Sequence, residues 1–353
     1  MKSIHYIVLA LVFLLSCSMD EEKGVNSGRE IEFRVVTTRG SVVDMNNFRS
    51  FTVVAFKADG THFYTDEYEW NEVSFVSSEK HMWPTDGSTL YFQAYHQFGT
   101  EPSGETDTSE GSLLLEDFSP ARTVSSQVDF ICATASGNKN LAEPVALNFR
   151  HALSQIEVKG FNSNHRYICS VAGIRIAHVL SKGTYDFVNE EWNLGESKGV
   201  YEVIYTSPIT LTDTPVSLMT QTDDNAFLIP QTLEPWLLDD ETNELKGAYV
   251  ALLVRITTID GAIIYPLVDN PDVISGYDWA ALPLDGKWEQ GVKYTYKWNI
   301  PTVGGFVYPE KPTPEISMID NFVSGSSIMG DQVTFLKPTL GDFNHNVVDR
   351  LYL

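Results

Sequence analysis

Histidine, cysteine and carboxylate side chains are the groups in this sequence that could do chemistry, as metal ligands, nucleophiles or acid–base pairs. The chain of 353 residues contains 8 His, 3 Cys and 47 Asp and Glu. The histidines show no HxxxH spacing and no neighbouring cysteine, which leaves a structural zinc site without support. A GxSxG nucleophile motif and a GxxxxGK(S/T) phosphate loop are also missing. Among so many carboxylates chance pairs are certain, and none identifies a glycosidase. We therefore predict a protein that is not an enzyme and needs no metal or cofactor.

The N-terminal residues carry the pattern of an exported lipoprotein. Met1–Ser16 has Lys2 at its charged start and an apolar run, Ile7–Leu15, too short to cross a bilayer as a helix. Leu14–Cys17 resembles a bacterial lipobox, in which the cysteine is acylated and becomes the mature N-terminus; an ordinary secretory leader is the alternative. Residues 17–29 then form an acidic tether, whose Asp20–Glu22 cluster resembles a signal for surface export. We expect lipidation at Cys17 and a surface-exposed location on the cell outer membrane.

The other two cysteines, Cys132 and Cys169, lie within apolar strand patterns and have no CxxC neighbour. Two separate buried thiols are the favoured interpretation, because the two residues lie on opposite sides of a predicted domain joint. One disulfide in an oxidising compartment is the alternative.

The overall charge restricts the class of partner. The formal net charge is -23, and such a surface repels nucleic acid and anionic lipid. We therefore expect no nucleic-acid partner, and membrane contact only through the lipid anchor.

A change of periodicity near mid-chain predicts a sharp bend. Val145–Phe149 places its large apolar residues on odd positions, whereas Ile156 and Val158 continue the pattern on even positions. A strand cannot change phase in this way without turning its core face to solvent. The corner is therefore Arg150–Ser154, which we interpret as the joint between two β domains. His151 within it is expected to be a structural, hydrogen-bonded residue rather than a catalytic one.

The pattern of the remaining sequence predicts many short strands separated by Gly, Pro and Asp, which is typical of β-sandwiches. A length of 353 residues suits two domains with sizeable cores. We predict an all-β fold with domains at residues 30–150 and 151–300 and an extension at 301–353. Thr100–Ser112 has no apolar residue and is expected to be a loop, while Arg150–Ser154 and Glu234–Leu238 are the candidates for a helical turn.

The two ends of the predicted sandwiches carry isolated strand patterns. Ile31, Phe33 and Val35 alternate on one face and are followed by a polar loop that contains Arg39. After a Pro-containing connector, Val333 and Phe335 again share one face. A strand outside two complete sandwiches needs a sheet edge to pair with.

Several segments resemble, in matching order over roughly residues 30–300, the fimbrillin family of lipoprotein pilins from Gram-negative anaerobes. The corner segment Leu147–Ser154 (LNFRHALS) resembles the family's mid-chain signature, and the others are Asp129–Ala135, Gly183–Phe187 with Trp192, Leu228–Leu233 and Trp288–Tyr296.

This resemblance implies two tandem transthyretin-like β-sandwiches in a subunit that assembles into surface fimbriae and contributes to adhesion. In that family a trypsin-like protease cuts after an arginine near the first strand, and a neighbouring subunit's strand fills the vacated groove. By this resemblance Arg39 is the cleavage site, Ile31, Phe33 and Val35 form the removable strand, and Val333 and Phe335 belong to the donor strand. The implied partners are other fimbrial subunits, a processing protease and a host or bacterial surface glycan or protein.

A monomeric glycan-binding surface lipoprotein is the alternative function, because aromatic side chains stack on sugar rings. Trp70 and Trp83 are the candidates for an exposed contact surface. Trp192, Trp288 and Trp298 lie near strand ends and are expected to be structural.

Overall fold

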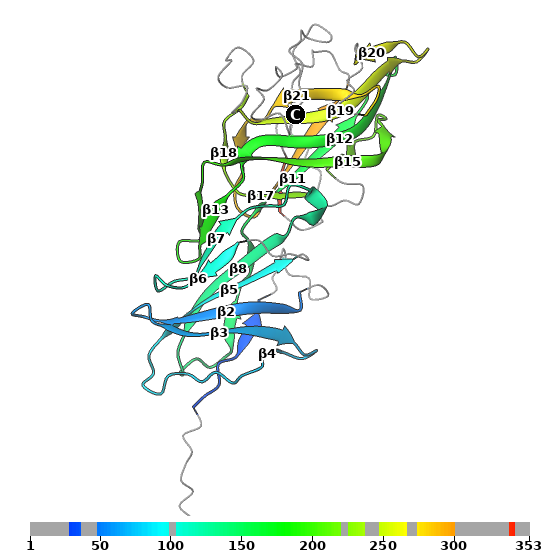
Figure 1. The fold of residues 1–353 in the computed structure, drawn as a ribbon. Helices are drawn as coiled ribbons and strands as arrows, with labels where there is room; N and C mark the ends of the chain where they lie inside the picture. The colour runs from blue at the N-terminus through cyan, green and yellow to red at the C-terminus, as the bar shows by residue number, and fades with distance from the viewer. Residues whose placement is uncertain are drawn as a thin grey trace, which may run out of the picture.

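The computed structural model describes residues 28–36, 48–98, 104–219, 225–236, 247–266 and 274–300, together with the backbone of a strand at 339–342. These residues form strands with a single short 3-10 turn, η1 (Val124–Ser126). The prediction of an all-β fold is thereby confirmed. The described chain is elongated, with the sheets of its N-terminal half at one end and those of its C-terminal half at the other (Figure 1).

The N-terminal half is built on a six-stranded sheet that is buried on both faces. Phe51, Val53 and Ala55 face one core, whereas the alternate residues Val54 and Phe56 face another. The sheet order is β10-β8-β5-β2-β3-β4. Its strands are β2 (Ser50–Lys57), β3 (His62–Trp70), β4 (Phe75–Ser77), β5 (Leu90–Phe98), β8 (Asp129–Gly137) and β10 (Arg150–His151).

Two smaller sheets cover these faces. One side packs against a parallel pair, β1 (Phe33–Val35) with β9 (Val145–Leu147). The other side packs against a four-stranded sheet of order β14-β13-β7-β6. The strands of that sheet are β6 (Glu105–Asp107), β7 (Leu114–Phe118), β13 (Gly183–Asp186) and β14 (Glu191–Leu194). The β13–β14 hairpin thus pairs with β7, a strand that precedes the mid-chain corner.

The C-terminal half is a sandwich of two five-stranded sheets around the largest apolar cluster of the described chain. The first sheet contains β11 (Ser154–Phe161), β16 (Val216–Ser217), β17 (Ala226–Leu228), β23 (Val292–Asn299) and β24 (Thr339–Asp342). The second contains β12 (Tyr167–Leu180), β15 (Lys198–Thr210), β19 (Tyr249–Thr258), β20 (Ile263–Tyr265) and β21 (Asp278–Pro283). A two-stranded ribbon joins β18 (Thr232–Leu233) to β22 (Gly286–Lys287).

The mid-chain corner divides one stretch of sequence among three sheets. β9 pairs with β1, β10 pairs with β8, and β11 enters the C-terminal sandwich beside β23. The predicted change of phase between Phe149 and Ile156 therefore reflects a real change of sheet. The expected helical turn at Arg150–Ser154 is wrong, because Arg150 and His151 pair with Cys132 and Ile131 of β8 in extended form.

Two other local expectations also differ from the structure. Within Thr100–Ser112, expected to be a loop, Glu105–Asp107 forms β6 by pairing with β7. Of Glu234–Leu238, expected to be a helical turn, the structure describes residues 234–236, in which Pro235 forms an isolated bridge with Ala248. In both cases, pairing with a residue far away in the sequence determines the backbone conformation. Such pairing cannot be predicted from local periodicity.

Candidate functional site

The first described residues, 28–36, are hydrogen-bonded along one edge to β9. Phe33 lies opposite Val145 in parallel register. The amide of Val145 donates to the carbonyl of Glu32 at 2.8 Å, and the amide of Val36 donates to the carbonyl of Leu147 at 2.8 Å. The segment is therefore a paired strand rather than a loose N-terminal arm.

The opposite edge of the same segment is paired as well. The amide of Ile31 donates to the carbonyl of His81 at 2.8 Å, and the amide of Trp83 donates to the carbonyl of Arg29 at 2.9 Å. The first part of the segment, residues 29–31, therefore pairs with residues 81–83 on one edge, and its second part, residues 32–36, pairs with residues 145–147 on the other. Removing the segment would leave donors and acceptors unpaired on both sides, which is the condition under which another strand is accepted.

Phe33 anchors the segment in a cluster of aromatic rings. Its side chain is 5% exposed. It meets Tyr68, Phe92 and Phe51 edge-on, with ring centroids 4.9, 5.1 and 6.4 Å away. Edge-to-face contacts of this kind add to the free energy of burial and favour a ring of this size at the position.

The neighbours of Phe33 follow the alternation expected of a strand with one buried face. Ile31 is 3% exposed and belongs to the same core cluster, and Val35 is half-buried against it. Arg34 points to solvent. Ile31, Phe33 and Val35 do share one face, as predicted, although Val35 contributes less burial than its two partners.

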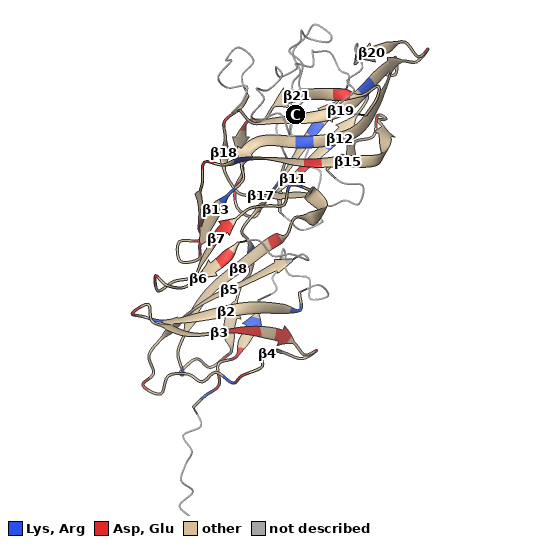
Figure 2. Ribbon diagram, viewed as in Figure 1, with Lys and Arg blue, Asp and Glu red and all other residues tan. Residues whose placement is uncertain are grey.

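The carbonyl of His81 accepts the hydrogen bond from Ile31, and the side chain of His81 anchors this loop to β3. Its ring is stacked on Tyr64, with centroids 3.8 Å apart and planes 3° from parallel, and its Nε2 lies 2.8 Å from Asp66 Oδ2. β3 also carries Glu67 and Glu69 and is drawn red over part of its length in Figure 2. No sequence motif marks His81, because its partners Asp66 and Tyr64 lie fifteen residues or more away along the chain.

Four predicted site residues lie outside the described residues: Cys17, Arg39, Val333 and Phe335. Of the C-terminal extension, the structure describes the backbone of β24, which pairs antiparallel with β23; Leu340 lies opposite Tyr294. The uncut chain therefore carries a C-terminal strand on the edge of its own second sandwich.

The tryptophans do not form an exposed platform in the described structure. Trp83 is 4% exposed and lies in the N-terminal core, so its prediction as a contact residue is wrong. Trp70 is half-buried against the same core. Structural roles are confirmed for Trp288 and Trp298, which are buried, and for Trp192, which packs on the third apolar cluster.

Neither described cysteine has the surroundings of a reactive thiol. Cys132 and Cys169 are both free and buried. Burial raises the pKa of Cys132 to about 12, with the hydrogen bond to Tyr185 acting in the opposite direction. Burial also raises the pKa of Cys169 well above its usual range. Both thiols therefore stay protonated and poorly nucleophilic at neutral pH.

The described part of the chain contains neither a cluster of metal-ligating side chains nor a helix that could span a membrane. No group of three or more His, Cys, Asp or Glu side chains there is arranged to hold a metal ion. Within the same residues there is no helix with the length and apolar character needed to cross a membrane.

The comparisons with known proteins bear on the family of this chain and on its fold. The family model described as fimbrillin-like matches residues 34–317. A fimbrial protein from Bacteroides vulgatus has a TM-score of 0.59 at 14% identity, with 90% of this chain and 100% of that chain covered. The fimbrial anchor protein Mfa2 from Porphyromonas gingivalis has a TM-score of 0.35 at 11% identity, with 89% and 98% covered. No curated protein sequence matches. Because the family model spans most of its length, this chain belongs to the fimbrillin-like family.

Proposed function

We propose that this chain is a structural subunit of surface fimbriae that is exported as a lipoprotein on Cys17 and assembles by protease-triggered donor-strand exchange. Membership of the fimbrillin-like family supports a fimbrial or adhesin-like role. The observation that carries the finer proposal is the position of residues 28–36. This segment is the first described strand of the chain, is paired on both edges, and fills an aromatic core with Ile31 and Phe33.

The proposed trigger is cleavage after Arg39, in the stretch between Val36 and Phe48. A cut there leaves residues 28–36 attached without a covalent link, through hydrogen bonds, the Lys80–Glu30 ion pair and the apolar burial provided mainly by Ile31 and Phe33. Transfer estimates put the burial of two such side chains at about 3–6 kcal/mol. That contribution stabilises the uncut monomer, and a strand that offers equivalent side chains can replace it once the covalent link is lost.

The proposed replacement is the segment around Val333 and Phe335 of a second copy. Its alternation matches that of the removable strand, so one aromatic side chain would occupy the position of Phe33. The family and the lipobox also support export to the outer membrane surface. We take residues 30–150 and 151–300 as the two domains, with the β13–β14 hairpin of the second packed on the sheet of the first, and residues 301–353 as the donor extension. Other fimbrial subunits and a processing protease would then be the partners.

The test is treatment of the purified full chain with an Arg-specific protease, followed by N-terminal sequencing, size exclusion and electron microscopy. We expect a new N-terminus at Gly40, loss of residues 28–36 and the appearance of polymers. Arg39→Ala should block polymerisation, whereas Arg49→Ala, which removes an exposed arginine paired with Glu72, should not.

Truncation before Asp331 should also leave the cut protein monomeric. Polymers from the truncated chain would overturn the assignment of the donor strand. A cut monomer that does not assemble and binds glycans on an array would instead support the alternative of a glycan-binding surface lipoprotein.

A further inference from the structure

The mid-chain corner, Arg150–Ser154, is hydrogen-bonded to two later parts of the chain that play no part in the proposed strand exchange. The carbonyl of Ala152 accepts a hydrogen bond from Trp192 Nε1 at 2.7 Å. The carbonyl of Leu153 accepts one from the amide of Gly291 at 2.9 Å. Ser154 Oγ donates to the carbonyl of Glu289 at 2.9 Å. Consecutive corner residues are therefore bound first to the β13–β14 hairpin and then to the loop between β22 and β23.

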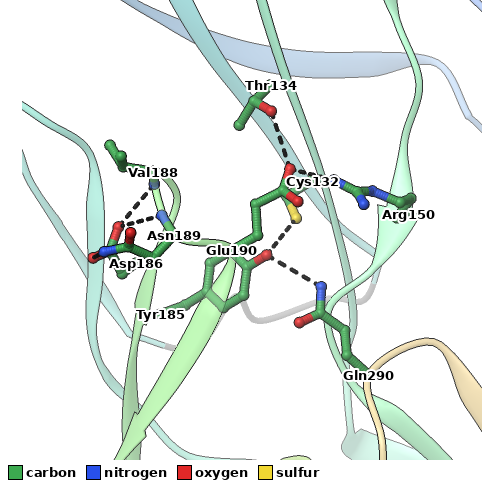
Figure 3. A network of polar contacts seen from close by, with 9 residues as sticks. All are labelled: Cys132, Thr134, Arg150, Tyr185, Asp186, Val188, Asn189, Glu190 and Gln290. Atoms are coloured by element: carbon green, nitrogen blue, oxygen red, sulfur yellow. Dashed lines mark hydrogen bonds and ion pairs between the residues drawn. The ribbon is translucent and has the colours of Figure 1, made fainter.

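Glu190, in the turn of the β13–β14 hairpin, binds the N-terminal sheet. Its carboxylate accepts hydrogen bonds from Thr134 Oγ1 of β8, at 3.0 Å, and from the guanidinium of Arg150 in β10 (Figure 3). Its backbone has a φ of 55°, in the left-handed region that a glutamate rarely adopts. Asp186 shapes this turn by accepting hydrogen bonds from the amides of Val188 and Asn189. The turn therefore holds a backbone conformation that aims the carboxylate at the neighbouring sheet.

Tyr185 joins both halves of the chain through one buried hydroxyl. The residue is 0% exposed. Its oxygen lies 3.1 Å from Cys132 Sγ and accepts a hydrogen bond from Gln290 Nε2 at 3.2 Å (Figure 3). Cys132 belongs to β8 of the first half, and Gln290 lies just before β23 of the second half. The tyrosine ring also packs edge-on against Phe130, with centroids 5.3 Å apart.

These contacts surround a shared apolar core. The third cluster combines residues of the six-stranded sheet, of β7 and of the β13–β14 hairpin, together with Ala152, Leu153 and Ile229. Domains joined by a small, polar interface move relative to each other by default. A buried core with a satisfied polar network opposes such motion, because opening it would expose apolar surface and unpaired polar groups together.

We propose that the corner residues 150–154, the β13–β14 hairpin and residues 289–291 form a junction clamp that holds the two sandwiches in one fixed orientation. Glu190 is a positioning residue that binds the turn of the hairpin to the six-stranded sheet, in addition to the pairing of β13 with β7 and the shared apolar core, and Gln290 binds the hairpin to the C-terminal sandwich. If the chain is a fimbrial subunit, which rests on the proposed function, a fixed joint would transmit tension along the fibre without bending at each subunit. The clamp itself is a property of the uncut monomer and does not depend on assembly.

The test measures the distance between the two sandwiches in the uncut full chain. Spin labels are placed at Tyr91→Cys in β5 and Ile204→Cys in β15, whose native side chains are 47% and 50% exposed. A Cys17→Ser background leaves only the two buried native cysteines, Cys132 and Cys169. Double electron–electron resonance should then give one narrow distance distribution for the otherwise wild-type chain.

Glu190→Gly removes the carboxylate while keeping a residue that favours the left-handed turn. We expect at least a doubling of the width of the distance distribution, with an unchanged far-UV circular dichroism spectrum. The matched control is Glu196→Gly, which removes an exposed glutamate from the loop after β14 and should leave the width unchanged.

Gln290→Leu provides an independent variant from the other side of the junction, and it decides the outcome if Glu190→Gly does not fold. It removes the hydrogen bond to Tyr185 at similar side-chain size, and it should also broaden the distribution. Widths equal to wild type in the folded variants would overturn the proposal. If the otherwise wild-type chain gives a narrow distance distribution but does not undergo strand exchange after cleavage, the proposed function is contradicted and the junction clamp is still supported.

Discussion

Truncating Phe33 to alanine tests whether residues 28–36 complete the N-terminal core. The side chain is 5% exposed and lies among Phe51, Tyr68 and Phe92. Alanine keeps the backbone pairing with β9 but removes the ring and its three edge-on contacts. The variant therefore isolates the contribution of side-chain burial from that of the hydrogen-bond ladder.

The expected loss of stability is about 3–5 kcal/mol, the range found when a buried phenylalanine is reduced to alanine. The contacts of Phe33 favour the upper part of this range, because each aromatic pair adds about 0.5–1.5 kcal/mol beyond burial. With a urea m-value of about 3 kcal/mol/M, the unfolding midpoint should fall by about 1–1.7 M.

Urea unfolding followed by circular dichroism on the uncut chain measures this loss. The control is Arg34→Ala, one position away on the exposed face of the same strand, and its free energy of unfolding should change by less than about 0.5 kcal/mol. Equal midpoints for the two variants would mean that the first strand does not fill the core, and the strand-exchange proposal would lose its physical basis.

The other expected outcomes concern export, metal ions and pH. Cys17→Ala should abolish incorporation of labelled fatty acid, and continued labelling would contradict the lipobox interpretation. Thermal unfolding with and without a strong chelator should agree, whereas a fall beyond the few degrees that about 1 kcal/mol produces would reveal a metal site. Burial lowers the pKa of His96, so the unfolded chain takes up this proton first as the pH falls below about 6.5. Neutral, buried His96 therefore contributes to the free energy of unfolding above that pH, and the contribution is lost on acidification. The free energy of unfolding falls through this residue by no more than about 1.4 kcal/mol per pH unit. Stability measured between about pH 7.5 and 5.5 should therefore be less pH-dependent in His96→Gln than in wild type, and equal slopes would contradict the assignment.

Local pattern was sufficient for several features of the candidate site. The alternation of Ile31, Phe33 and Val35 predicted a strand with one buried face, and the phase change after Phe149 predicted the corner. Both depend on the two-residue period of a strand, which is visible in one stretch of chain. Trp83 shows the limit of such reasoning, because its place in the aromatic and acidic segment Tyr64–Pro84 suggested exposure, while the folded chain buries it beside Phe92.

The sequence by itself therefore determined the all-β class, the apolar face of the first strand, the mid-chain corner and the family signature. Only the tertiary structure decided which strands meet. It paired β13 with β7 across the corner, made Glu105–Asp107 a strand, and placed Glu190 against Arg150. The physical reason is that periodicity shows which side chains avoid water, whereas a backbone hydrogen bond or an ion pair depends on a partner at any distance along the chain.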